Sequence, residues 1–177
     1  GGPALAHLRR PQVLVAPGAP VGCIPVDGER HDPDALARAW GAGLRPRLVY
    51  CVPKFSNPSG ACLSAERRLR LGALAEQYGF VIVEDDPYHA LNFSNPPSTP
   101  IARHAPDHTV TLGSASKVVA PGLRVGWLHA PPWIRGPMIR LKQTLDLHTA
   151  PLPQLIAPDV VGDERCLGSP PGFSRDL

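Results

Sequence analysis

Residues 80–83 form an uninterrupted apolar run, FVIV, directly after a helical pattern that ends at Gly79. A strand that is apolar on both of its faces suits a parallel sheet covered by helices. Shorter apolar runs at 48–52, 110–112 and 125–128 predict three more strands. Two further runs, at 12–15 and 23–26, predict strands or strand edges, and Pro25 argues against a central position for the second. Because these runs alternate with helical patterns, we expect an α/β fold with a mainly parallel sheet covered by helices.

Helix signals stand between the apolar runs. Asp32 can cap a helix over 33–40, with a proline at its first position. Ser64 can cap a second helix, in which apolar residues recur at helical spacing. A third helix is predicted around 134–145, where Pro137 indicates either a kink or a later start.

Composition and charge exclude several classes of protein. The 177 residues suffice for one domain with a core, the net charge is +3, and the arginines are dispersed, so no nucleic-acid surface is indicated. The densest basic run, ERRLR at 66–70, is predicted to be a solvated helix face. The four cysteines form no C-x-x-C pair, so neither a metal site nor a disulfide framework follows. The lack of a disulfide framework fits a reduced, cytoplasmic setting. Since no apolar run approaches about 18 residues, we expect no membrane span.

Polar groups follow three of the predicted strands at the point where each strand ends. The run at 48–52 leads into PKFSNPSG, the run at 80–83 into EDDPY, and the run at 110–112 into GSASK. In open α/β sheets, ligands bind at the carboxyl ends of the strands. Taken singly, each group also has a plain structural role as a turn residue, a helix cap or a solvated loop. The candidate side chains are Asn57, Asp85, Tyr88, Ser114, Ser116 and Lys117.

The combination of these groups matches the needs of one cofactor, pyridoxal phosphate. This cofactor requires an amine, a carboxylate at its pyridine nitrogen and hydrogen-bond donors at its 3′ oxygen. Lys117 supplies the amine and Asp85 the carboxylate, while Asn57 and Tyr88 supply the donors. We therefore predict Lys117, Asp85 and Tyr88 as catalytic residues that also bind the cofactor, together with Asn57.

The phosphate of this cofactor needs a cationic cup lined by hydroxyl groups. Ser114 and Ser116 supply hydroxyls in the loop that carries Lys117, and Arg124 follows seven residues after that lysine. The small residues around Lys117 let the amine and the phosphate share one crowded loop. The predicted phosphate ligands are therefore Ser114, Ser116 and Arg124.

Three motifs, YCVPKFSNPSG, EDDPY and GSASKVVAPGLRVGW, resemble in sequence and order those of the class I/II, fold-type I aminotransferases. The similarity runs from about residue 20 to about residue 154 and is closest to the 2-aminoadipate, kynurenine and aromatic branch. The resemblance implies that Lys117 is the Schiff-base lysine, which also moves a proton between Cα and C4′. It implies that Asp85 is the partner of the pyridine nitrogen, and that Tyr88 and Asn57 bind the 3′ oxygen. It assigns the phosphate to the same three side chains as the chemistry does.

The resemblance also implies a reaction and its partners. Members of this family exchange an amino group between an L-amino acid and a 2-oxo acid, bind pyridoxal phosphate and act as homodimers. Residues 1–153 are then part of the cofactor-binding large domain, and 154–177 are an irregular tail that departs from the family pattern. The family's phosphate loop, its ring-stacking aromatic residue and its arginine for the substrate carboxylate have no counterpart here. We therefore expect residues 1–177 alone to be inactive.

Three other interpretations stay open at this level. A transcription regulator can use this fold as a sensor that binds pyridoxal phosphate. A fold-type I lyase or synthase keeps the same cofactor residues, and a shortened chain can be a non-functional remnant. The EDDPY motif together with the later LHTAPLPQ favours the aminotransferase.

Overall fold

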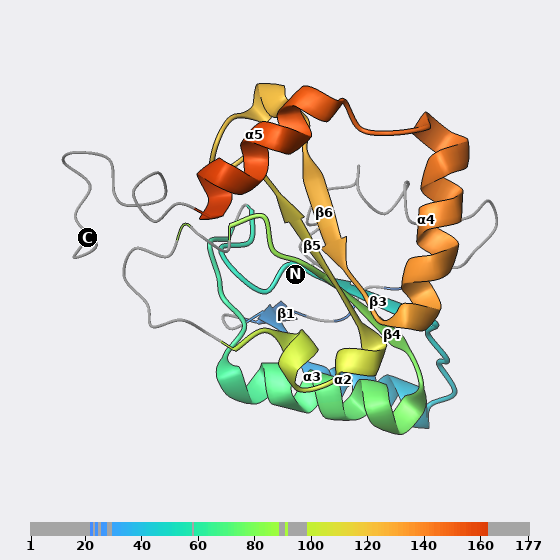
Figure 1. Ribbon diagram of the computed structural model, residues 1–177. Helices are drawn as coiled ribbons and strands as arrows, with labels where there is room; N and C mark the ends of the chain where they lie inside the picture. The colour runs from blue at the N-terminus through green and yellow to red at the C-terminus, as the bar shows by residue number, and fades with distance from the viewer. Residues whose placement is uncertain are drawn as a thin grey trace.

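The computed structural model describes residues 22, 24, 26, 27, 30–57, 59–88, 91 and 99–162. Its centre is a four-stranded sheet with the strand order β3 (Leu48–Cys51), β4 (Val81–Asp85), β5 (Thr109–Ser114) and β6 (Gly126–His129). The first three strands are parallel, and β6 runs antiparallel to β5. The strands predicted at 48–52, 80–83, 110–112 and 125–128 are present, which confirms a mainly parallel α/β fold (Figure 1). The predicted strand at 12–15 lies outside the described residues, and the last residue of the run at 23–26 begins the short strand β1 (Val26–Asp27).

Helices α2 (Pro33–Gly41) and α3 (Ala65–Tyr78) lie where the sequence predicts them. An Asp32 carboxylate oxygen accepts a hydrogen bond from Asp34 N at 2.9 Å, and Ser64 Oγ accepts one from Arg67 N at 3.3 Å. Both helices are therefore capped at their N-termini. Gly79 ends α3 with a φ of 74°, a left-handed conformation that glycine adopts without a steric penalty. The remaining short elements are β1 (Val26–Asp27), β2 (Arg30–His31), η1 (Ile101–Arg103), η2 (Pro106–His108) and η3 (Pro121–Leu123).

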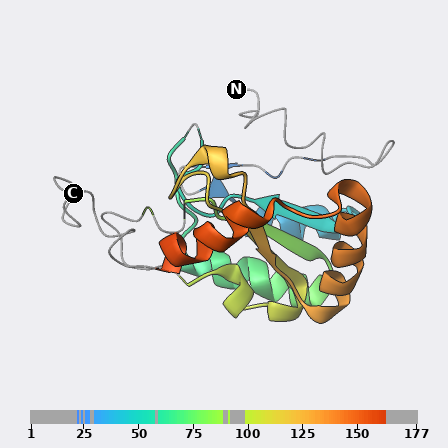
Figure 2. The same cartoon turned by 45° about the horizontal axis from the view of Figure 1, so that its top comes forward.

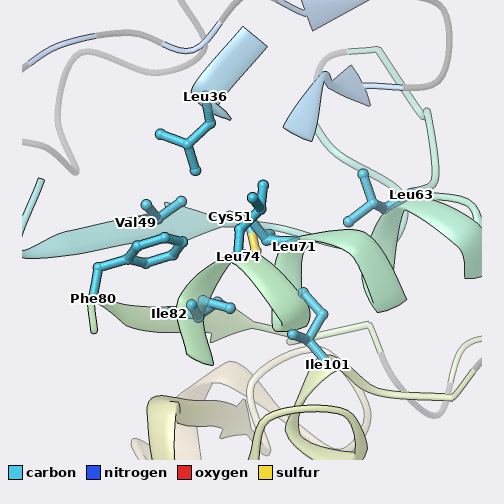
Figure 3. Packing of buried hydrophobic residues seen from close by; sticks show 10 residues of the cluster. Leu36, Val49, Cys51, Leu63, Leu71, Leu74, Phe80, Ile82 and Ile101 are labelled. Carbon is cyan, nitrogen blue, oxygen red and sulfur yellow. The ribbon is translucent and has the colours of Figure 1, made fainter. Parts of the chain in front are cut away.

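The core lies between the sheet and a layer made of α2, α3 and η1. Alternation along the strands turns Val49 and Cys51 of β3, and Ile82 of β4, toward this layer, where all three are buried. Figure 3 shows them packed against leucines of α2 and α3 and against Ile101 of η1. The cluster consists of Leu36, Val49, Cys51, Leu63, Leu71, Leu74, Ala75, Phe80, Ile82 and Ile101.

The other side of the sheet is much more open. There the chain forms α4 (Pro132–Asp146) and α5 (Pro151–Gly162), and Figures 1 and 2 both show the sheet between α5 and α3. All four residues of β6 are exposed, and Leu145 and Leu152 are 75% and 67% exposed. None of the helices in the described residues combines the length and apolar character needed to cross a membrane.

The last two helices differ from the sequence prediction in two ways. Helix α4 begins at Pro132 and contains Pro137, so the later start is not found. Helix α5 continues to Gly162, so residues 154–162 are helical, contrary to the irregular tail predicted for 154–177. Residues 163–177 lie outside the described part of the chain.

The prolines of α5 explain why its sequence does not look helical. Pro151 and Pro153 occupy the first turn, where a backbone N–H has no helical partner to lose. Pro158 lies inside the helix, where proline is unfavourable and hides the helical pattern further. Leu152, Leu155 and Ile156 then recur at helical spacing.

The prediction of a solvated face at 66–70 is wrong for Arg68, which is 1% exposed. Its Nη1 lies 3.6 Å from Oε1 of Glu84, whose side chain is fully buried. Its Nε and Nη2 donate hydrogen bonds to the backbone oxygens of Leu63 and Pro53, each at 2.9 Å. The guanidinium thus connects α3 both to the loop after β3 and to β4.

Glu84 extends this connection to the segment that precedes β5. Its Oε1 accepts a hydrogen bond from Ile101 N at 3.0 Å, and its Oε2 accepts one from Ala102 N at 3.4 Å. Thr111 Oγ1, on β5, donates to the same Oε2 at 3.3 Å. A single buried ion pair therefore joins α3, the loop after β3, β4, η1 and β5.

We expect Glu84→Ala to lower the free energy of unfolding by about 3–5 kcal/mol, because it leaves the buried Arg68 charge without its partner. Urea unfolding followed by circular dichroism measures this change. Glu76, an exposed acid on the same helix α3, gives the matched control, and Glu76→Ala should change the free energy by no more than about 0.5 kcal/mol. Equal effects of the two substitutions would show that the ion pair does not hold the fold together.

Candidate active site

The predicted site residues lie where β3, β4 and β5 end and where β6 begins. The parallel register places Asp85, the last residue of β4, beside Leu112 of β5. Ser114 is the last residue of β5, and Ser116 and Lys117 follow it in a turn. The three parallel strands therefore deliver their polar groups to one edge of the sheet, as ligand sites in α/β folds require.

Asp85 is half-buried, and its Oδ2 accepts a hydrogen bond from the hydroxyl of Tyr50. Tyr50 lies on β3 opposite Val83 of β4, and Val83 shares a face of the strand with Asp85 because side chains alternate. Ile82 and Glu84 lie on the opposite face, toward α3. The strand thus separates Asp85 from the hydrophobic core and turns it toward the open side of the sheet.

The acids on either side of Asp85 are tied to cations. Glu84 pairs with Arg68, and Oδ2 of Asp86 lies 3.6 Å from Nζ of Lys54. The Lys54 and Asp86 side chains are only 6% and 5% exposed. Their burial and their ion pairs indicate that Glu84 and Asp86 are structural neighbours of the site.

Lys117 is exposed in a tight turn after β5. Ala115 is buried at the start of this turn, and its N–H donates to the backbone oxygen of Val125 at 3.0 Å. Ser116 N donates to Ser114 Oγ at 3.1 Å. The turn is therefore held by its neighbours, while its lysine projects into solvent.

The chain contains three lysines, and their surroundings differ. Lys54 is buried beside a carboxylate, and Lys142, on α4, binds Asp146 at 2.7 Å. Within the described residues, Lys117 makes no ion pair. It is the lysine of this chain that combines an exposed amine with a position at the strand ends.

The ladder between β5 and β6 brings Arg124 to the Lys117 turn. The ladder pairs Ser114 with Gly126, and the next backbone bond continues it from residue 115 to residue 125. Arg124 directly precedes Val125, so the chain brings it to the start of the turn that holds Ser116 and Lys117. An exposed guanidinium and two hydroxyl groups thus share this corner of the sheet.

Two loops of this edge contain residues in the left-handed backbone region. Arg124 has a φ of 53°, and Phe55, in the loop that carries Asn57, has a φ of 45°. For a residue with a side chain, this conformation costs roughly 1–2 kcal/mol. Such strain concentrates at functional sites, so its presence in both loops supports a site at this edge.

Asn57 and Tyr88 lie in loops that leave the same edge, six residues after β3 and three residues after β4. Asn57 is exposed, and Tyr88 is half-buried. Neither side chain makes a hydrogen bond in the part of the chain that the structure describes. The structure therefore brings the Lys117 turn, Arg124 and the Asp85 strand together, and does not join Asn57 or Tyr88 to them by a hydrogen bond.

Comparison with known proteins decides the family. Residues 12–160 match the aminotransferase class I and II family. The chain belongs to this family. The matched interval extends a few residues beyond both ends of the similarity predicted from the motifs, and it includes most of α5.

The relatives include members of the predicted branch. Aromatic-amino-acid aminotransferase 1 of Thermococcus litoralis is 40% identical over 139 residues, which are 76% of this chain and 33% of that protein. The 2-aminoadipate transaminase of Thermus thermophilus is 37% identical over 158 residues, 87% of this chain and 38% of that protein. The crystal structure of Pyrococcus horikoshii kynurenine aminotransferase in complex with PMP aligns with a TM-score of 0.75 at 36% identity, over 81% of this chain and 38% of that one. The chain thus spans 33–38% of the length of these relatives.

Sequence reasoning missed three residues around the site: Tyr50, Lys54 and Arg68. Tyr50 carries the one hydroxyl in the apolar run at 48–52, and Lys54 stands between a proline and a phenylalanine. Both features indicate a polar group among buried neighbours, and either signal could have been followed. Arg68 gives no such signal, because it lies in a run of charged residues.

Amine-specific acylation of the native chain checks these environments. We expect Lys117 and Lys142 to react readily, and Lys54 to react at least roughly tenfold more slowly, because its amine is reached only when the structure opens locally. Chymotryptic peptide mapping by mass spectrometry measures the three rates. Labelling of Lys54 as fast as that of Lys142 would contradict the buried Lys54–Asp86 pair.

Proposed function

We propose that this chain is the cofactor-binding core of a pyridoxal-phosphate-dependent aminotransferase that moves an amino group between an L-amino acid and a 2-oxo acid. The observation that carries the proposal is the placement of an exposed amine, Lys117, and an oriented carboxylate, Asp85, at the ends of adjacent parallel strands. Membership of the aminotransferase class I and II family supports the same reaction.

The donor set fits this cofactor. The corner formed by Ser114, Ser116 and Arg124 combines hydroxyl groups with an exposed guanidinium, which suits a phosphate dianion. The Asp85 carboxylate suits a protonated pyridine nitrogen, because opposite charges in contact favour the charged form of both. Lys117 supplies the amine through which the cofactor is held.

Each of these side chains has a distinct task. Asp85 holds a proton at the ring nitrogen, and Lys117 Nζ takes the proton from the substrate Cα. Tyr88 and Asn57 donate hydrogen bonds to the 3′ oxygen from the loops that follow β4 and β3. When bound, pyridoxal phosphate supplies the electron sink that makes the Cα proton removable.

We further propose three properties of the whole protein. The family resemblance supports a homodimer, and the absence of a cysteine pattern for disulfides in the sequence supports a cytoplasmic location. The large-domain part, set at 1–153 from the sequence, continues through α5, since this segment is helical and the family match runs to residue 160. The mass of the full-length protein in solution and its fractionation from cells test the first two properties.

Reductive labelling tests the cofactor assignment. After incubation with pyridoxal phosphate and borohydride reduction, we expect a pyridoxyl group on the peptide that contains Lys117. The label should disappear in Lys117→Ala and persist in Lys142→Ala, which removes an exposed lysine from α4. A label that survives in Lys117→Ala at its original level would refute the assignment.

Residues 1–177 alone should not reach the turnover typical of enzymes, about 1 per second or more. The reason is that Lys117 and Arg124 are exposed to water, which weakens the electrostatic stabilisation a transaminase needs. Assays with several pairs of amino acid and 2-oxo acid, run beside the Thermus thermophilus 2-aminoadipate transaminase, measure this. Turnover at the rate of that enzyme would show that the exposed site residues of this chain suffice for transamination.

A further inference from the structure

We propose that Tyr50 is a positioning residue of the cofactor site, acting through the hydrogen bond that its hydroxyl donates to the Asp85 carboxylate. This inference rests on the proposed function. Tyr50 is the first residue of the motif YCVPKFSNPSG, but the sequence pattern predicts no role for it. The proposed role is an indirect one, exerted on the cofactor through Asp85.

The geometry of the sheet makes this contact specific. Tyr50 is opposite Val83, and Asp85 is the next residue of β4 on the same face. A tyrosine ring reaches along the strand far enough for its hydroxyl to meet Oδ2 of Asp85. The neighbouring core residues of β3, Val49 and Cys51, point the other way and are buried against the α3 layer.

The Tyr50 hydroxyl is a neutral donor, unlike the cations that pair with the two neighbouring acids. Glu84 faces the guanidinium of Arg68, and Asp86 faces the ammonium of Lys54. The Tyr50 hydroxyl, in contrast, brings Asp85 a hydrogen bond without a positive charge. A hydroxyl at this position adds no positive charge of its own beside the carboxylate, whereas a lysine or arginine at position 50 would compete with the pyridine nitrogen for it.

Orientation is the second effect of the bond. The carboxylate torsion of an aspartate is broad and roughly two-fold, so a half-buried Asp85 at a strand end has more than one orientation available. A donor fixed on the adjacent strand selects one of them before the cofactor arrives. A binding side chain that a neighbouring residue already holds in place binds its ligand more tightly, because it loses less conformational freedom on binding.

The experiment uses the whole 177-residue chain and pyridoxal phosphate itself. Tyr50→Phe removes the hydroxyl and keeps the ring. Tyr78→Phe is the matched control, because this half-buried tyrosine stacks on Trp40 with ring centroids 4.4 Å apart and its hydroxyl makes no hydrogen bond within the described residues. Asp85→Ala and the double variant Tyr50→Phe/Asp85→Ala complete a double-mutant cycle.

We expect Tyr50→Phe to weaken pyridoxal phosphate binding by about three- to tenfold, the effect of losing one hydrogen bond. The absorption band of the bound cofactor changes with pH, and Tyr50→Phe should also shift the midpoint of this titration. Loss of packing alone does not produce such a shift. Tyr78→Phe should leave both quantities unchanged. In the Asp85→Ala background, Tyr50→Phe should have no further effect on binding.

The outcomes separate this inference from the function on which it rests. If wild-type protein labels Lys117 but Tyr50→Phe binds the cofactor as Tyr78→Phe does, the positioning role is wrong and the function stands. An undiminished effect of Tyr50→Phe in the Asp85→Ala background also overturns the role, because the hydroxyl then acts elsewhere. A Tyr50→Phe chain that loses its cooperative unfolding transition shows that the hydroxyl serves the fold and overturns it as well. A wild-type chain without Lys117-dependent binding overturns both proposals.

Discussion

The buried ion pair between Arg68 and Glu84 is the contact on which the geometry of the strand ends depends. Through it, helix α3 is bound to the loop after β3, to β4, and to η1 before β5. Burying two charges is favourable only when their remaining hydrogen-bonding groups are also satisfied. Here most of these groups are satisfied: backbone carbonyls accept from Nε and Nη2 of Arg68, and backbone N–H groups and one hydroxyl donate to the carboxylate. Nη1 of Arg68 makes no hydrogen bond within the described residues and lies 3.6 Å from the Glu84 carboxylate. The pair thus specifies where the loop after β3, strand β4 and η1 lie. The candidate site is built on the first two of these.

Side chains alternate between the two faces of β4, so one face serves the core and the other serves the candidate site. Ile82 and Glu84 belong to the α3 side, where they pack and anchor, while Val83 and Asp85 belong to the other side. A shift of one residue in register would exchange these sets and place the candidate catalytic acid in the core. The buried glutamate, which must meet Arg68, therefore also fixes the direction in which Asp85 points.

The parts of the fold predicted from sequence are those with strong local signals. The FVIV run predicts β4, and Ser64 and Gly79 bound α3, because strand patterns, caps and left-handed glycines depend on a few adjacent residues. Arg68 was missed because burial of a charge in a run of charged residues depends on a distant partner, whereas the apolar neighbours of Lys54 were a local signal that was not followed. Helix α5 was missed because prolines in a first turn resemble a loop. The Lys117 turn, Arg124 and Asp85 are brought to one edge as the motifs suggest, but no sequence pattern reveals the Tyr50 bond, which joins residues 35 positions apart.

Strand β6 has a consequence for how this polypeptide meets other chains. In the described part of the structure it is the last strand of the sheet, and all four of its side chains are exposed. Its free side therefore presents a row of backbone N–H and C=O groups spaced to accept another strand. No charged residue lies within Gly126–His129 when its histidine is neutral, so the usual deterrent to such pairing is missing. The sheet is thus a template that can be extended by one more strand, and β6 is the place where that addition begins.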